Sequence, residues 1–226
     1  IGARAYHVLT HPSDYFFVPG RDLLQTVIEV VSIQNGGNAI FGSLIGGAVG
    51  VLIASRVTGV RFWSFADALV PGLLVAQAVG RLGNYFNVEL YGQPTDLPWG
   101  LEVPVGNAAF PAGLEAGTLF HPTFLYELLW NLFGVVVLLL IERQIRPRWG
   151  RFFALYLIWY GIGRIWFESL RIDPSETLLG IRTNVWTAAA AVLLGIVLFI
   201  VQRRRHPGRE VDVHRQGRGW ERPTQA

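Results

Sequence analysis

The chain has 226 residues, of which 51% are hydrophobic and 15% are charged, and its formal net charge is +3. This composition is too apolar for an average soluble domain of this length and favours an integral membrane protein. Because the chain contains no Cys, disulfides, thiolate metal sites and a cysteine nucleophile are excluded.

Five apolar runs are long enough, or nearly so, to form membrane-spanning helices. They occupy approximately residues 36–55, 64–80, 123–141, 152–170 and 185–201. Residues 1–9 look like the end of another span, and the first residue is Ile1 rather than Met, so we expect a fragment or a processed chain. We therefore predict an all-α, polytopic membrane helix bundle over residues 1–202. A soluble bundle of buried helices is the alternative, but five runs with few or no charges argue against it.

Arginine-rich segments lie on alternate connections, at residues 55–61, 142–151 and 203–210. The positive-inside rule places these segments in the cytoplasm. The remaining connections then lie outside, at residues 10–35, 81–122 and 171–184. The tail, residues 203–226, is rich in Arg, Gly and Pro, which predicts a disordered cytoplasmic extension.

Arg164 lies within an apolar run, where an arginine costs at least about 2.5 kcal/mol unless it has a partner or a polar cavity. Tyr160, Arg164 and Glu168 are spaced at i, i+4 and i+8, and Arg171 follows three residues later, so the four lie on one helical stripe. The stripe either forms an internal ion pair that supports helix packing or lines a cavity for an anionic group.

A second polar cluster follows the run that ends near residue 80. Arg81 and Asn84 fall on one helical face, and Asn87 and Glu89 come directly after. Arginine offers a fork of donors that matches phosphate oxygens, whereas a snorkelling arginine in a polar interfacial turn is the alternative. Because both arginine clusters are predicted at the outer face, we expect one shared anionic site.

A third cluster, "HPTFLYE", begins at His121 and contains Tyr126 and Glu127. His121 could act as a base near neutral pH or could cap the next helix. The sequence shows no ligand spacing for a metal and no pattern for a covalent nucleophile. These features favour an outer-leaflet phospholipid headgroup as ligand and a direct transfer, in which the second substrate supplies the nucleophile, without a metal or cofactor.

These motifs resemble those of the bacterial phosphatidylglycerol–prolipoprotein diacylglyceryl transferase family. "GRLGNYFNVELYG" (80–92) is similar to the family signature, and "GGNAIFGSLIGG", "HPTFLYE" and "YGIGRIWFESLRIDP" occur in the family's order. The resemblance covers about residues 1–200. It implies a seven-span enzyme of the bacterial plasma (inner) membrane, with its active site toward the outer leaflet and its C-terminus in the cytoplasm.

The resemblance also implies a reaction and its substrates. The diacylglyceryl group of phosphatidylglycerol moves to the lipobox cysteine thiol of a prolipoprotein signal peptide, and glycerol phosphate is released. The implied partners are these two substrates and the lipid bilayer, with no nucleic acid. A membrane transporter or scramblase for anionic lipids or solutes is the alternative.

The resemblance assigns roles to the same residues. Arg81 would bind the phosphate of phosphatidylglycerol, and the residues that shape that site would be Asn84, Asn87, Glu89 and Gly92. The second essential cluster would be Tyr160, Arg164, Glu168 and Arg171, with Arg164 stabilising the leaving phosphate. His121, Tyr126 and Glu127 form a candidate supporting group. Many relatives carry a His, proposed as a base, where this chain has Phe41. Either that His is dispensable, or deprotonation is assisted elsewhere, for instance by Tyr160, Glu168 or His121. We favour a positioning role over an obligatory base.

Overall fold

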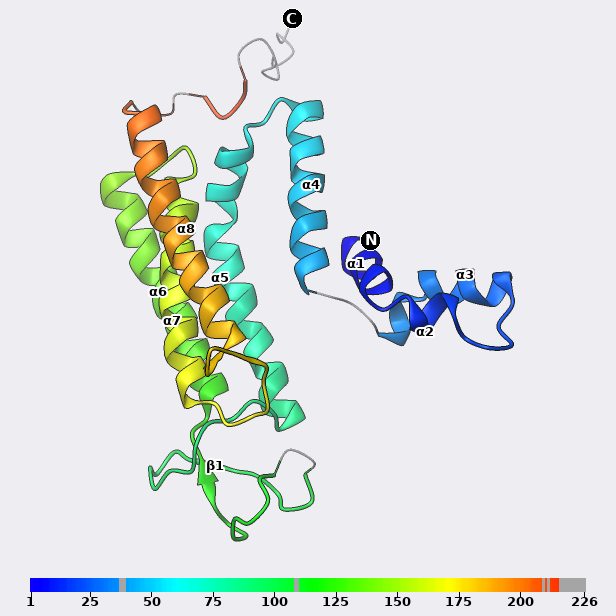
Figure 1. Cartoon of the computed structure of the whole chain (residues 1–226). Coiled ribbons are helices and arrows are strands. Elements are labelled where there is room, and N and C mark those ends of the chain that lie inside the picture. The colour runs from blue at the N-terminus through cyan, green and yellow to red at the C-terminus, as the bar shows by residue number, and fades with distance from the viewer. Residues whose placement is uncertain (37–39, 108–109, 209, 211, 216–226) are drawn as a thin grey trace, which may run out of the picture. The chain divides into compact units, whose positions relative to one another are not determined.

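The computed structural model describes residues 1–36, 40–107, 110–208, 210 and 212–215. The chain folds as two compact units, one formed by residues 1–62 with the segment that begins at 212, and the other by residues 63–211. Helices dominate the described part of both units, as the all-α prediction expected (Figure 1).

The described part of the first unit contains short helices, a 3-10 turn and one long helix. They are α1 (Gly2–Thr10), α2 (Ser13–Phe16), α3 (Leu23–Val31), η1 (Ile33–Asn35) and α4 (Ile40–Thr58). Arg4 is buried and donates hydrogen bonds to three backbone carbonyl oxygens, those of Glu29, Val30 and Gly36. This guanidinium group therefore ties α1 to the segment around the end of α3.

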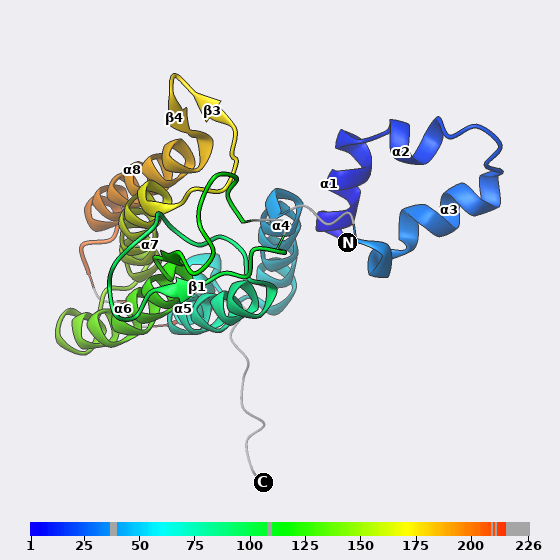
Figure 2. The ribbon, with the colours of Figure 1, turned by 90° about the horizontal axis from the view of Figure 1, so that it is seen from below.

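The second unit is built on four long helices. They are α5 (Phe62–Asn87), α6 (Thr123–Ile145), α7 (Arg151–Leu170) and α8 (Thr183–Arg205). Both α6 and α8 pack against α7, and the four helices run side by side in both views (Figures 1 and 2). Two small antiparallel sheets lie in the connections: β1 (Leu101–Glu102) pairs with β2 (Leu119–Phe120), and β3 (Thr177–Leu178) pairs with β4 (Ile181–Arg182).

The core of this bundle joins three of its helices. Its buried residues are Val70 and Leu74 of α5, Leu138 of α6, and Phe152 and Tyr156 of α7. The α5 pair and the α7 pair are each spaced at i, i+4, so each pair lies on one helical face. Where this apolar core ends, the side chains that face the centre of the bundle become charged.

The five predicted apolar runs correspond to α4, α5, α6, α7 and α8. Among the described residues, three of these helices are long and apolar enough to cross a membrane, namely α5, α6 and α8, and Gly42–Thr58 of α4 forms a shorter apolar helix. α7 does not meet this criterion, because the polar side chains of its stripe lower its mean hydropathy. The span count therefore stays a prediction, while a membrane helix bundle is consistent with the structure.

The outer connection predicted at residues 10–35 contains helices α2 and α3. α3 begins at a capping box, in which the Asp22 side chain accepts from the Gln25 backbone N–H and the Gln25 side chain accepts from the Asp22 N–H. This arrangement satisfies two of the free N–H groups at the helix start. Of the predicted disordered tail, residues 209, 211 and 216–226 lie outside the described residues.

Candidate functional site

Glu127 is a buried carboxylate near the start of α6 that joins two arginines from different helices. Its Oε2 atom lies 2.5 Å from Nη2 of Arg81 on α5. Its Oε1 atom lies 3.7 Å from Nη1 of Arg164 on α7. The two guanidinium groups that the sequence places 83 residues apart therefore face the same carboxylate.

Glu168 forms the second centre of charge, one helical turn after Arg164 on α7, and it is completely buried. Arg164 Nη2 lies 2.9 Å from one of its oxygens, and Arg182 Nε lies 2.8 Å from the other. Arg171 Nη1 approaches at 3.5 Å, and the Asn184 side-chain amide donates a hydrogen bond of 3.0 Å. Because these donors occupy both of its oxygens, Glu168 is placed to orient cations rather than to accept a proton from a substrate.

Asp173 lies just beyond the end of α7, where Arg171 binds it through two parallel hydrogen bonds of 2.7 and 2.8 Å. Arg182 donates a third bond of 3.0 Å. Burial alone would raise the pKa of Asp173, but the bonds and charges of Arg171 and Arg182 outweigh burial and hold that pKa below its ordinary value. Burial alone would lower the pKa of Arg171, whereas Asp173 and Glu168 raise it. Both groups are therefore ionised at neutral pH.

The arginine network consists of seven side chains that are linked by these ion pairs: Arg81, Glu127, Arg164, Glu168, Arg171, Asp173 and Arg182. Four guanidinium groups face three carboxylates, so the network carries one excess positive charge. Arg164 Nη1 is buried and makes no hydrogen bond within the described part of the chain. A buried donor without a hydrogen bond costs about 1–3 kcal/mol, so an anionic oxygen at this position would be stabilised.

The connection after α5 holds the ends of α6 and α7 together. Gly92 donates its backbone N–H to the carbonyl oxygen of His121 at 2.8 Å, and Gln93 donates to that of Leu170 at 2.9 Å. A Cβ atom on Gly92 would lie 2.8 Å from the His121 Cβ and 2.9 Å from the Leu170 oxygen. Only glycine fits this junction without displacing its neighbours, and the junction brings Glu127 and Arg164 close to Arg81. Gly92 therefore shapes the site through its backbone.

Glu89 is held in a strained turn at the end of α5. Its Oε1 atom accepts hydrogen bonds of 3.0 Å from both Asn84 and Asn87. Asn84 also accepts a bond of 3.2 Å from Arg81 Nη1, which links the turn to the arginine network. Val88 and Leu90 both have positive φ angles, of 51° and 58°, a conformation that costs such residues about 1–3 kcal/mol each. Such strain is typical of functional segments.

The other predicted site residues lie beside the arginine network without an ion pair to it. Tyr160 stacks on Tyr156 with 6.1 Å between ring centroids. Tyr126 shares its hydroxyl with His121 Nδ1 at 3.0 Å and with the Trp99 indole N–H, also at 3.0 Å. This geometry favours the second interpretation of His121, a local hydrogen-bond partner that holds the entry to α6.

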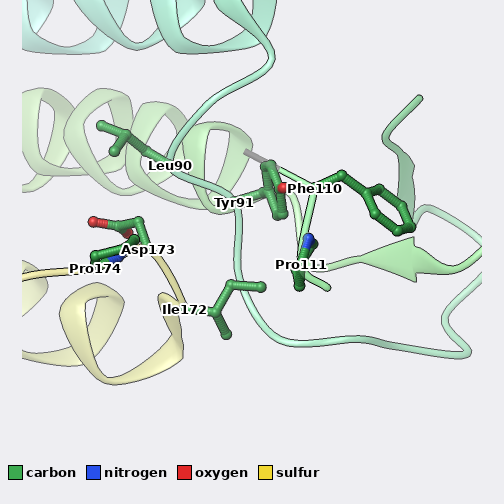
Figure 3. A pocket seen from close by; sticks show the side chains of 7 residues that line it. All are labelled: Leu90, Tyr91, Phe110, Pro111, Ile172, Asp173 and Pro174. Atoms are coloured by element: carbon green, nitrogen blue, oxygen red, sulfur yellow. The ribbon is translucent and has the colours of Figure 1, made fainter. Parts of the chain in front are cut away.

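A pocket of about 270 Å³ adjoins Asp173 at one end of the arginine network (Figure 3). Its walls are mostly apolar and are formed by Leu90, Tyr91, Phe110, Pro111, Ile172, Asp173 and Pro174. The Asp173 carboxylate is already hydrogen-bonded to two guanidinium groups. The remaining lining of the pocket is mostly apolar, so the pocket suits an apolar part of a ligand whose charged part lies at the arginine network. Among the described residues, no group of three or more His, Asp or Glu side chains is placed to hold a metal ion.

Three members of this site had no predicted role: Asp173, Arg182 and Asn184. Arg182 could have been found because it is one more arginine on the side predicted to be poor in positive charge. Asp173 lies within the quoted motif "YGIGRIWFESLRIDP", two residues after Arg171. Asn184 carries no signal in the sequence, because only the hairpin formed by β3 and β4 returns it to Glu168.

Comparisons with known proteins agree on one family. The family model described as "Prolipoprotein diacylglyceryl transferase" matches residues 1–201. A phosphatidylglycerol–prolipoprotein diacylglyceryl transferase of Leifsonia xyli is 58% identical over 226 residues, which cover 99% of this chain and 67% of the relative. A relative of the same name from Frankia alni is 47% identical over 90% of this chain and 52% of its own length. One from Bifidobacterium longum is 43% identical over 97% of this chain and 70% of its own length. The chain thus spans between about half and about two thirds of the length of these relatives.

Proposed function

This chain belongs to the prolipoprotein diacylglyceryl transferase family, and from that premise we propose that it transfers a diacylglyceryl group from phosphatidylglycerol to a prolipoprotein. The acceptor is the thiol of the lipobox cysteine. A bond forms between its sulfur and the terminal glycerol carbon as the bond from that carbon to a phosphate oxygen breaks. The thiol proton is released to the surrounding water, and glycerol phosphate leaves with the electron pair of the broken bond. The product is a thioether.

The observation that carries this proposal is the approach of Arg81 and Arg164 to one carboxylate, Glu127. In the proposed complex, the phosphate of the donor lipid takes a place between these two guanidinium groups. Arg81 holds the phosphate, and Arg164 Nη1, which lacks a hydrogen bond within the described residues, donates to the leaving oxygen. Fixed donors that face developing negative charge are an effective means of lowering a reaction barrier. A nucleophile on the substrate also agrees with a chain that contains no Cys.

The surrounding residues hold these two arginines in place. Glu168 orients Arg164 and is itself held by Arg171, Arg182 and Asn184. On the other side, Asn84 connects Arg81 to the strained turn at Glu89. In the proposed enzyme, Asn87, Gly92 and Tyr160 complete the walls of the phosphate site. The alternative function, transport or scrambling of anionic lipids, gains no support from membership of a transferase family.

We place this reaction at the outer leaflet of the bacterial inner membrane, with the C-terminus in the cytoplasm. The support is the alternation of arginine-rich connections, since residues 142–151 and 203–208 lie at the opposite ends of α6, α7 and α8 from the arginine network. A site at the membrane surface would meet a lipid donor laterally and a signal peptide that has crossed the membrane.

The test is glycerol phosphate release by membranes that contain the protein, supplied with phosphatidylglycerol and a lipobox peptide. Arg81→Ala and Arg164→Ala should each lower the turnover about 10²–10³-fold, the loss typical for removal of one donor to a developing oxyanion. A peptide with Ser in place of the lipobox Cys should give no release above background.

Arg148→Ala is the matched control, because Arg148 forms an ion pair with Glu142 at the opposite end of α6. This variant should keep wild-type turnover. Wild-type turnover in Arg81→Ala or Arg164→Ala would refute the site, and equal release with the Ser peptide would refute the thiol acceptor.

A further inference from the structure

Asp67 is a buried carboxylate on α5, far along the helix from the arginine network, and only 2% of it is exposed. Its Oδ2 atom accepts a hydrogen bond of 2.9 Å from the backbone N–H of Gly150, and its Oδ1 atom accepts one of 2.9 Å from that of Phe153. Both donors lie at the N-terminus of α7. Because the N-cap residue is glycine, α7 has no side-chain cap of its own.

The Asp67 contact lies the same distance along α5 and α7 from the two arginines, Arg81 and Arg164. Fourteen residues separate Asp67 from Arg81 on α5, and fourteen separate Gly150 from Arg164 on α7. Fourteen helical residues rise about 21 Å and complete nearly four turns. Arg81 therefore lies on nearly the same face of α5 as Asp67, and Arg164 lies on nearly the same face of α7 as Gly150. Since α5 and α7 run in the same direction (Figure 1), a contact that aligns them at Asp67 also aligns their arginines.

Other features of this contact indicate that α5 and α7 need such an alignment. Pro71 lies four residues after Asp67 and has no N–H to donate to the Asp67 carbonyl oxygen, so the α5 backbone is less constrained there. A Cβ atom on Gly150, whose φ is +83°, would lie 2.6 Å from the Trp63 ring. The N-terminus of α7 therefore packs directly against α5, and the Asp67 carboxylate accepts hydrogen bonds from the backbone N–H groups of Gly150 and Phe153 there.

We propose that Asp67 is a positioning residue that sets the axial register of α7 against α5. By capping α7 from α5, it keeps Arg164 level with Arg81, so that both reach Glu127. The carboxylate satisfies two helix-terminal donors and lies at the positive end of the helix dipole. The inference rests on the proposed function for its effect on turnover, whereas its effect on helix register can be measured without any reaction.

The register is tested by the distance between two spin labels on the purified protein in nanodiscs. Val79→Cys on α5 and Ile162→Cys on α7 provide exposed attachment sites close to the two arginines, and this chain has no other Cys. Asp67→Ala should shift the interspin distance or broaden its distribution. Asp67→Asn keeps one carbonyl acceptor and should have a smaller effect in the same direction.

Turnover provides the second readout. Register errors of about 1 Å can cost about 10²-fold in rate, so the kcat of Asp67→Ala should fall by about that factor. KM for phosphatidylglycerol should change much less, because Arg81 stays on α5 and still holds the phosphate. Asp67→Asn should recover part of the kcat.

Ser64→Ala is the matched control. Ser64 lies on the same helix and donates a 2.5 Å hydrogen bond to Glu210, so this variant removes a contact at the same end without touching α7. It should leave both the interspin distance and kcat unchanged. An unchanged distance distribution in both Asp67→Asn and Asp67→Ala, or in Asp67→Asn alone if Asp67→Ala does not fold, would overturn the inference. Absence of glycerol phosphate release in the wild type would refute the proposed function but would leave the distance test valid.

Discussion

Glu127 and Glu142 of α6 allow a buried ion pair to be compared with a partly exposed one. The Glu127 side chain is 7% exposed and faces Arg81 and Arg164, whereas the Glu142 side chain is 27% exposed and pairs with Arg148. Removing one partner of a buried pair costs about 3–5 kcal/mol, against about 0–1 kcal/mol for a surface pair. We therefore expect Glu127→Gln to lower the melting temperature of the detergent-solubilised protein clearly and Glu142→Gln to leave it nearly unchanged.

The reason for this difference is that the uncharged amide introduced by Glu127→Gln could not neutralise the two guanidinium groups that approach it from different helices. Two like charges would then face each other in a site with little water. Equal melting temperatures for the two variants would mean that water already screens Arg81 and Arg164, and would argue against a desolvated phosphate site.

At the level of single residues, the sequence reveals charged side chains in apolar segments, because placing a charge there costs free energy unless it has a partner. An arginine in an apolar run is informative because it must have a partner, which is why Arg81 and Arg164 could be selected without a structure. Their partner Glu127 could be named only as a supporting residue, since no spacing rule connects α6 to α5 or α7. Asp67 gave no signal, because its partners are backbone N–H groups that every residue except proline has. The catalytic and binding roles assigned to the selected residues stay predictions.

Two tryptophans fit against two glycines where α6 meets α7. Trp130 of α6 and Trp159 of α7 stack with 4.4 Å between ring centroids, and each donates its indole N–H to the other's carbonyl oxygen at 3.3 Å. A Cβ atom on Gly163 would collide with the Trp130 indole nitrogen, and one on Gly134 would collide with that of Trp159. This packing holds α7 against α6 one turn from Glu127.

Gly163→Ala should therefore destabilise the protein by about 1–3 kcal/mol, the usual cost of overpacking. Gly72→Ala in α5 is the matched control, because a Cβ atom there would meet nothing within 4 Å, and alanine is favoured over glycine in a helix by up to about 1 kcal/mol. Thermal melting in detergent should show a lower midpoint for the first variant and an equal or higher midpoint for the second. A Gly163→Ala protein as stable as the wild type would show that the tryptophan pair can shift without loss.

Helices could be located from apolar runs, but their ends and packing could not. α5 continues past the apolar run to Asn87 because Arg81 and Asn84 find partners inside the bundle. α7 is a full helix even though its polar stripe makes it less apolar than a membrane span usually is. The hairpin of β3 and β4 was not expected, since its strands have two residues each and are defined by their pairing.

At the scale of the whole molecule, four short motifs were enough to predict the family, and the comparisons confirm it. This succeeded because three of the four motifs contain six of the seven residues of the arginine network, all except Arg182, and the identities of these residues are constrained by charge as well as by packing. The number of spans and their orientation depend on the membrane, which the contacts within the chain do not reveal. They are therefore best decided by an experiment in cells.

Single cysteines in this Cys-free chain can decide the orientation. Glu115→Cys and Ser175→Cys place a thiol on exposed residues of the two connections predicted to lie outside, and Arg143→Cys places one near the end of α6 predicted to lie inside. A membrane-impermeant maleimide should label the first two in intact cells whose outer permeability barrier has been opened, and should label the third only after the plasma membrane is lysed. The physical basis is that arginine-rich connections are retained in the cytoplasm during insertion. Labelling of Arg143→Cys alone in intact cells would reverse the proposed leaflet, and opposite accessibility of Glu115→Cys and Ser175→Cys would show that α6 and α7 do not both cross the membrane.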